Sequence, residues 1–132
     1  MLYDDVQNYL KLNSYKEEGF TREDALQVTP VGLHKLVNML FDFLAVYEAK
    51  VVRLYVMYGL LKFVVYDARF PEANYAQRIA HSITAQTARI CIFTGVRTFR
   101  RKHIKGWPCL NTPLYVQYLN EAVERETPNA SV

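Results

Sequence analysis

The residues best suited to chemistry gather in one basic stretch, FTGVRTFRRKHIKGW, which spans residues 93–107. It holds five arginine and lysine side chains and one histidine, and it contains no carboxylate. Guanidinium and ammonium groups bind phosphates well, because each donates several hydrogen bonds and carries a positive charge. A polyanion, most simply the backbone of a nucleic acid, is therefore the partner that this stretch favours. The alternative is a solvated basic face that binds no ligand.

Charge is distributed unevenly along the whole chain, although the net charge is only +3. Residues 1–28 carry six acids against three bases, and residues 121–132 carry three acids against one base. Residues 29–72 are close to balanced. The segment 73–120 has no acid and seven bases, which are Arg78, Arg89, Arg97, Arg100, Arg101, Lys102 and Lys105. Such segregation again favours a nucleic-acid partner.

Metal-dependent chemistry finds little support in the residue spacing. The three histidines stand far apart, and none lies in an HExxH pattern. Cys91 and Cys109 lack a CxxC spacing, and they could join His81 and His103 in a metal site only if the chain folds back after Gly106. The sequence therefore predicts no metal site and no cofactor.

Other catalytic arrangements are equally weak. Asp67 and Glu72 could form a carboxylate pair at a turn, but acids near helix ends usually cap the helix or contact solvent. The five glycines are isolated, so no glycine-rich loop of the Walker or Rossmann type is present. We expect no catalytic residue and no enzymatic activity.

The elements that would position these residues are predicted to be helices. Thr21 precedes a capping-box pattern with Asp24, and Thr29-Pro30 and Thr112-Pro113 each place an N-cap threonine before proline. The sequence therefore predicts one all-α domain over residues 1–132, a bundle of about five helices with one or two long ones. Their expected ranges are 2–13, 22–28, 30–68, 71–105 and 113–126. Residues 1–28 would form acidic N-terminal helices, 29–106 the core with the basic fourth helix, and 112–126 the C-terminal helix.

The predicted third helix carries an apolar seam of 4,3 spacing that runs from Leu33 to Val65. At 1.5 Å per residue it would be about 58 Å long, which is more than a small domain needs. It should therefore break, at residues 48–50 or at Gly59, or pack against another subunit. Its apolar stripes form either ordinary bundle core or a surface for copies of the same chain.

Helical spacing would divide the basic stretch into two faces. Ile92, Val96, Phe99 and His103 would point inward. The outward face would carry Arg97, Arg101 and Lys105, flanked by Arg100 and Lys102, and Arg78 and Arg89 would extend it backward. A ridge of this kind contacts phosphates along a strand without reading bases.

Composition also bears on location. Every window of about 18 residues contains a charge, so no membrane-spanning helix is expected. The start, MLYDDVQNYL, has no apolar region of a signal peptide, and two cysteines are too few for a secreted disulfide scaffold. We expect a cytoplasmic protein without a membrane partner.

Three segments resemble motifs of a known family, the small helical subunits of type III CRISPR effector complexes. The first is TPVGLHKLVNMLFDFL, which is similar to a family helix in Thr29, Leu33, Lys35, Leu36, Asn38 and Met39. The second is LLKFVVYDAR, similar in Lys62, Tyr66 and Arg69. The third is VRTFRRKHIKGW, similar in His103, Lys105 and Gly106. The three follow in family order over about residues 29–106.

The resemblance implies a non-catalytic subunit, present in several copies beside other subunits of a ribonucleoprotein complex. It implies that Lys35, Lys62 and Arg69 contact the backbone of a guide–target duplex, with RNA as the favoured nucleic acid. The rival hypothesis is a helical coat protein of a filamentous archaeal virus, wrapped on its DNA genome. A basic N-terminal arm would favour the coat protein, and residues 1–28 are instead acidic.

Overall fold

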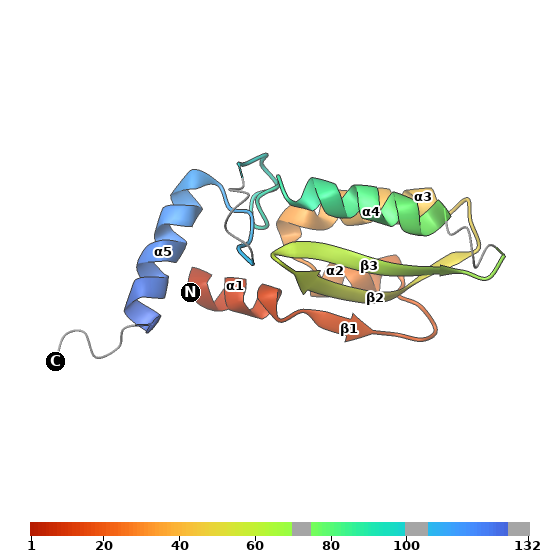
Figure 1. The fold of residues 1–132 in the computed structure, drawn as a ribbon, viewed down its shortest axis with the longest axis horizontal. Helices are drawn as coiled ribbons and strands as arrows, with labels where there is room; N and C mark the ends of the chain where they lie inside the picture. Colours follow the sequence, from red (N-terminus) through yellow and green to blue (C-terminus); the bar gives the residue numbers. More distant parts are fainter. Residues whose placement is uncertain (70–74, 100–105, 127–132) are drawn as a thin grey trace.

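The computed structural model describes residues 1–69, 75–99 and 106–126 of the chain. Within these ranges it is a mixed α/β fold, so the prediction of an all-α bundle is wrong. A three-stranded antiparallel sheet in the order β1-β2-β3 joins a short strand near the N-terminus to the two strands that follow α3 (Figure 1). The elements are α1 (Leu2–Leu10), β1 (Asn13–Tyr15), α2 (Arg22–Val28), the 3-10 turn η1 (Val31–Leu33), α3 (His34–Leu44), β2 (Ala49–Met57), β3 (Leu60–Asp67), α4 (Tyr75–Thr87) and α5 (Thr112–Glu126).

The predicted long helix 30–68 is instead one helix followed by a hairpin. Helix α3 already ends at Leu44, before the expected break at residues 48–50, and strand β2 begins at Ala49. The other expected break point, Gly59, lies in the turn between β2 and β3. The strand sequences AKVVRLYVM and LLKFVVYD are rich in valine and aromatic residues, which fit a pleated surface better than a helix. In β3 the buried side chains alternate, a period of two rather than 3.6. The pairing of these strands in the sheet therefore decides the structure of this segment, although its apolar residues also fit a helix with 4,3 spacing.

The hairpin turns at Tyr58-Gly59. Both residues have positive φ, 56° and 73°, as a two-residue type I′ turn requires. The Gly59 carbonyl accepts a hydrogen bond from the Tyr9 hydroxyl at 3.4 Å, and its Cα faces the backbone of Trp107. The turn is thereby held between α1 and the segment before α5.

The predicted helix 71–105 is also wrong in its length. Helix α4 ends at Thr87, and the chain then forms a tight loop in which Ile90 pairs with Arg97. The Cys91 N–H donates to the Val96 carbonyl, and Gly95 adopts a φ of 73° inside this loop. A left-handed glycine is typical of a turn and ends helical continuity. Ile92 is buried as expected, whereas Val96 is 57% exposed and Phe99 is 84% exposed, so neither points inward.

Three of the shorter helices agree with the sequence prediction. Helix α2 has the expected bounds, and its N-cap Thr21 forms a capping box with Asp24. Helix α5 starts at Thr112, and α1 ends three residues before the expected position because Asn13 enters β1. Helices α1 and α5 pack together through the stacked rings of Tyr3 and Tyr118, 5.8 Å apart. None of the helices in the described ranges is both long enough and apolar enough to cross a membrane.

The elements form two layers (Figure 1). The sheet and α4 make the front layer, and α2 and α3 lie behind it. One sheet face packs on the rear helices, with Leu54, Leu61, Phe63 and Val65 in one core with the apolar side of α3. No helix of the described residues lies over the other face in Figure 1.

Helix α4 is fastened to the outer edge of β3 by Gln77. Its Oε1 accepts from the Val65 N–H at 2.7 Å, and its Nε2 donates to the Phe63 carbonyl at 2.9 Å. An edge strand must satisfy these backbone groups, and here a side chain substitutes for a neighbouring strand. Gln77 therefore fixes how α4 stands beside the sheet.

Replacing Gln77 with leucine should lower the free energy of unfolding by about 2 kcal/mol, because two backbone groups of β3 lose this partner. The measurement is urea unfolding followed by circular dichroism. The matched control is Gln86→Leu on the exposed side of the same helix, which should change stability by less than about 0.5 kcal/mol. Equal losses in the two variants would contradict this role for Gln77.

Candidate nucleic-acid interface

The uncovered face of the sheet carries the candidate site. Register pairs Tyr15 with Arg53 and Arg53 with Val64, and the next row joins Asn13, Tyr55 and Lys62. Directly paired residues share a face, and residues two apart along a strand do so too. We call this set the open face; its side chains are Asn13, Tyr15, Lys50, Arg53, Tyr55, Met57, Leu60, Lys62, Val64 and Tyr66.

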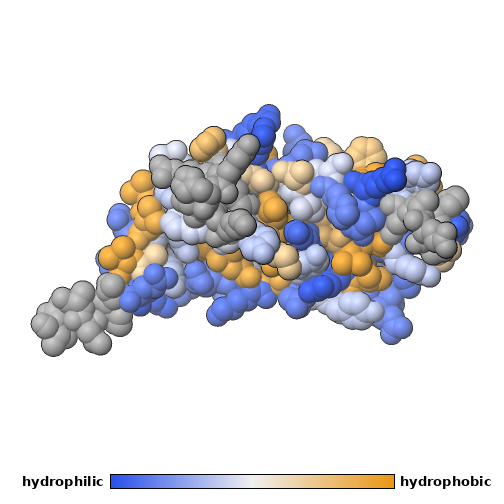
Figure 2. All heavy atoms as spheres, viewed as in Figure 1, coloured by the Kyte–Doolittle hydropathy of each residue, from blue (hydrophilic) through white to orange (hydrophobic). Residues whose placement is uncertain are grey.

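The open face combines cations with aromatic rings. It holds three tyrosines and three cationic side chains, and none of its ten residues is acidic. Tyr15 and Tyr66 are 66% and 49% exposed. Figure 2 views this side of the molecule, and hydrophilic and hydrophobic residues are interspersed over β2 and β3. The face can therefore offer both charge and flat apolar surface to a ligand.

Arg53 is held in place by its neighbours. Its Nε donates to the Asn13 Oδ1 at 3.0 Å, and its guanidinium carbon lies 4.0 Å from the centre of the Tyr55 ring. A guanidinium stacked on a ring keeps its remaining N–H groups in a fixed plane. Neither Arg53 nor Lys62 forms an ion pair with any residue in the described ranges. Lys50 packs against Gly19, next in the chain to Glu18, so an acid lies in its neighbourhood.

A groove of about 520 Å³ runs between α4 and the open face. Helical spacing places Gln77, His81, Thr84 and Ala85 on the side of α4 that faces β3. The sheet supplies the other wall, which consists of Tyr55, Leu60, Lys62, Phe63 and Val64. The groove therefore has a mainly apolar lining with a few polar groups and a lysine.

Of the sequence-predicted site residues, Lys62 alone is placed on the open face by the strand register. Arg78 is exposed on α4 and lies over the Tyr75 ring at 5.5 Å, beyond the groove. Lys35 is exposed on α3, in the rear layer. Arg69 pairs with Asp67 at 3.5 Å and Glu48 at 4.0 Å.

The predicted basic ridge does not form one helical face in the described part of the chain. Arg89 follows the end of α4, and Arg97 lies in the loop where it pairs with Ile90. The rest of the ridge, Arg100, Arg101, Lys102 and Lys105, lies outside the described residues. The same holds for His103. The residues that the sequence prediction missed are Lys50, Arg53, Tyr15, Tyr55 and Tyr66. The Tyr-Gly turn between two valine-rich runs is a signal that could have placed those on β2 and β3, whereas Tyr15 lies on β1 outside this hairpin.

The described residues form no site for metal binding, for a catalytic carboxylate pair or for a reactive thiol. No three histidine, cysteine or acidic side chains there come close enough to hold a metal ion. Asp67 is buried against Arg69, and Glu72 lies outside the described residues. Burial raises the pKa of the Cys91 thiol, but hydrogen bonds from the hydroxyl and N–H of Thr94 and the N–H of Phe93 outweigh it and hold that pKa below its ordinary value. Cys91 is fully buried, so a reactant cannot reach it.

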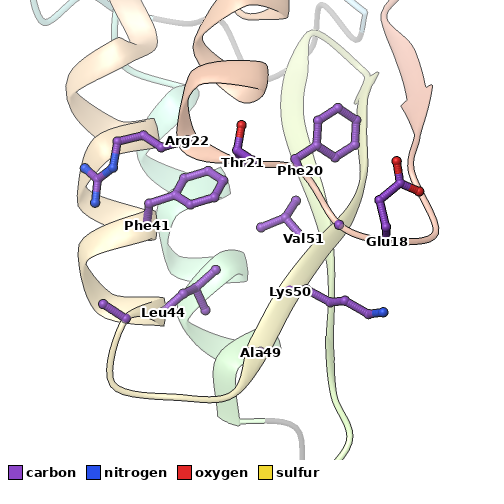
Figure 3. A pocket seen from close by; sticks show the side chains of 11 residues that line it. Glu18, Phe20, Thr21, Arg22, Phe41, Leu44, Ala49, Lys50 and Val51 are labelled. Atoms are coloured by element: carbon purple, nitrogen blue, oxygen red, sulfur yellow. The ribbon is translucent and has the colours of Figure 1, made fainter.

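A second pocket, of about 330 Å³, lies where the loop before α2 meets α3 and β2 (Figure 3). Phe41 and Leu44 of α3 point toward Val51 of β2 and form the apolar part of its lining, and the polar part includes Glu18, Thr21 and Lys50. Arg22 at its rim is engaged by Asp42 at 2.7 Å. Glu18 gives this pocket an acidic side chain, which the lining of the groove lacks, so the pocket suits an anion less well.

No family model, curated protein or solved structure matches the chain. The function is therefore inferred from the chemistry of the protein surface. Among the described residues, the open face is where unpaired cations and tyrosines come together. Chemically this face can hold phosphates by charge and flat rings by stacking.

Proposed function

We propose that the protein binds single-stranded nucleic acid through the open face and does no chemistry on it. The observation that carries this proposal is that tyrosines and cations without an ion-pair partner among the described residues alternate on one sheet face, none of whose ten residues is acidic. Sheets that bind RNA stack exposed bases on aromatic side chains, and arginine and lysine hold the neighbouring phosphates. Bases are available for such stacking only when they are not already paired and stacked in a duplex.

The finer assignment, a multi-copy small subunit of a type III CRISPR complex, has less support. The first motif does lie on η1 and α3, but LLKFVVYDAR forms β3 and the turn after it, whereas that family is helical. Lys62 and Tyr66 are residues of this motif that lie on the open face. The preference for RNA and the partnership with other subunits rest on this resemblance alone.

Purification of the native protein from its host would separate the finer alternatives. Short guide RNAs with large subunits would support the defence complex, and filaments containing viral DNA would support the coat protein. Either outcome leaves a nucleic-acid backbone as the partner, but nucleic acid recovered only as duplex would contradict the single-strand preference proposed for the open face.

Binding of a fluorescein-labelled oligonucleotide, measured by anisotropy, should weaken as salt rises. If Lys50, Arg53 and Lys62 each neutralise one phosphate, log K should fall with log salt at a slope of about −2, since each contact on a single strand contributes about −0.7. We expect oligouridylate and oligothymidylate to bind more tightly than a duplex of the same length. Tighter binding of the duplex, or no measurable binding of any strand at low salt, would overturn the proposal.

A further inference from the structure

The groove beside α4 presents polar groups that phosphate binding on the open face does not use. His81 is exposed at the groove, and the Thr84 side chain also lines it. Nine residues line the groove, and none of them is acidic. A cationic ligand would find no counter-charge in it.

The remaining lining is apolar and continuous with the open face. Leu60, Val64 and Ala85 line it together with the ring of Tyr55. Tyr55 pairs directly with Lys62 across the strands, so an aromatic ring and an ammonium group stand side by side at the junction of groove and face. A ligand held here would contact flat apolar surface and a positive charge together.

We infer that the groove holds one nucleobase, unstacked from the strand that lies on the open face. This inference rests on the proposed function and specifies where the strand turns a base inward. Lys62 contacts the phosphate next to that base, and His81 and Thr84 supply hydrogen-bonding groups for its polar edge. A volume of about 520 Å³ is within the range of sites that hold small heterocyclic ligands.

Charge complementarity distinguishes this occupant from an apolar peptide side chain. Lys62 stands at the groove and Arg53 stands one register row away, and neither is neutralised by an ion pair with a described residue. A nucleotide brings its own phosphate to satisfy such a cation, whereas a leucine or phenylalanine side chain would not.

The test fills the groove without removing a charge. Ala85 is exposed, so Ala85→Phe should fold normally while its ring occupies the space of the base. Binding of a single strand of about twelve nucleotides should weaken about tenfold, as expected for the loss of one base contact. The salt slope should stay unchanged, because no phosphate contact is lost. The matched control is Gln86→Phe, one residue along and on the exposed side of α4, which should bind like the wild type.

A second readout follows the base itself. An oligouridylate with one central 2-aminopurine should change in fluorescence when the wild type binds, and this change should be lost with Ala85→Phe and reduced with His81→Ala. If the wild type binds the strand and all three variants bind and fluoresce like it, the groove inference fails and the proposed function stands. If the wild type binds no strand at low salt, the proposed function fails, and with it the inference.

Discussion

Replacing Gly59 with alanine is expected to lower the free energy of unfolding by about 3 kcal/mol or more. Two costs add at this position. Gly59 has a φ of 73°, a conformation that costs an L side chain about 1 kcal/mol. An added Cβ would also overlap the carbonyl oxygen of Trp107 and lie 2.5 Å from its carbonyl carbon. Both are backbone atoms, so no side-chain rotation relieves the overlap.

Gly106 offers the matched control, because it separates the two costs. Its φ is 82°, yet an added Cβ would meet nothing within 4 Å. Gly106→Ala should therefore cost only about 1 kcal/mol. Urea unfolding of both variants measures the difference. Equal losses of unfolding free energy would show that the contact between the hairpin turn and Trp107 does not contribute to stability.

The fluorescence of Trp107, the single tryptophan, reports where the damage spreads. Its ring lies 5.4 Å from that of Tyr115 and 6.2 Å from that of Tyr118, both on α5. If Gly59→Ala pushes the Trp107 backbone away, these contacts loosen, and the emission should shift toward that of exposed tryptophan. A variant with wild-type emission and wild-type stability would contradict the assigned packing.

The signals that mark helix ends were the part of the fold that could be predicted from the sequence. The threonine cap at Thr21 placed the start of α2, because capping depends on a few adjacent residues. Helix α5 begins one residue earlier than expected, at Thr112, and the Asn111 Oδ1 accepts the hydrogen bond from the Leu114 N–H in place of the expected Thr112 cap. The hairpin was missed because Val51, Leu54, Leu61 and Val65 satisfy a 4,3 repeat and are also buried in strands. The register shift between Val51 and Arg53 puts Val51 and Leu54 on the same buried face although they are three residues apart, and Leu61 and Val65 are four apart, so their spacing also fits a helix.

The site was harder to predict than the elements. Charge counted by segment drew attention to residues 73–120, whereas Lys50 and Arg53 lie in a nearly balanced segment. Their side chains share a face with Lys62 only because of the strand register, and the extra residue Val52 shifts that register between Val51 and Arg53. Pairing of this kind joins residues distant in sequence, so composition and local spacing do not reveal it.

Reversing two charges on the open face, Arg53→Glu together with Lys62→Glu, should weaken single-strand binding about a hundredfold or more at low salt. A hydrogen bond from a charged donor to phosphate is worth roughly 1.5 kcal/mol, so losing two costs about 3 kcal/mol, and repulsion by the new carboxylates adds to this. The salt slope should fall by about 1.4, which is the share of two phosphate contacts. Each single reversal should weaken binding about tenfold.

Two further variants test whether the loss of binding is specific to the open face. Lys35→Glu changes the same charge on α3, in the rear layer, and should weaken binding less than about threefold. The triple reversal Arg97→Glu, Arg101→Glu and Lys105→Glu tests the basic stretch 93–107 directly. If the triple variant loses binding while the Arg53 and Lys62 double variant keeps it, the strand lies on that stretch and not on the sheet. The reverse pattern would place the phosphates on the open face, where the strand register sets Arg53 and Lys62 in adjacent rows.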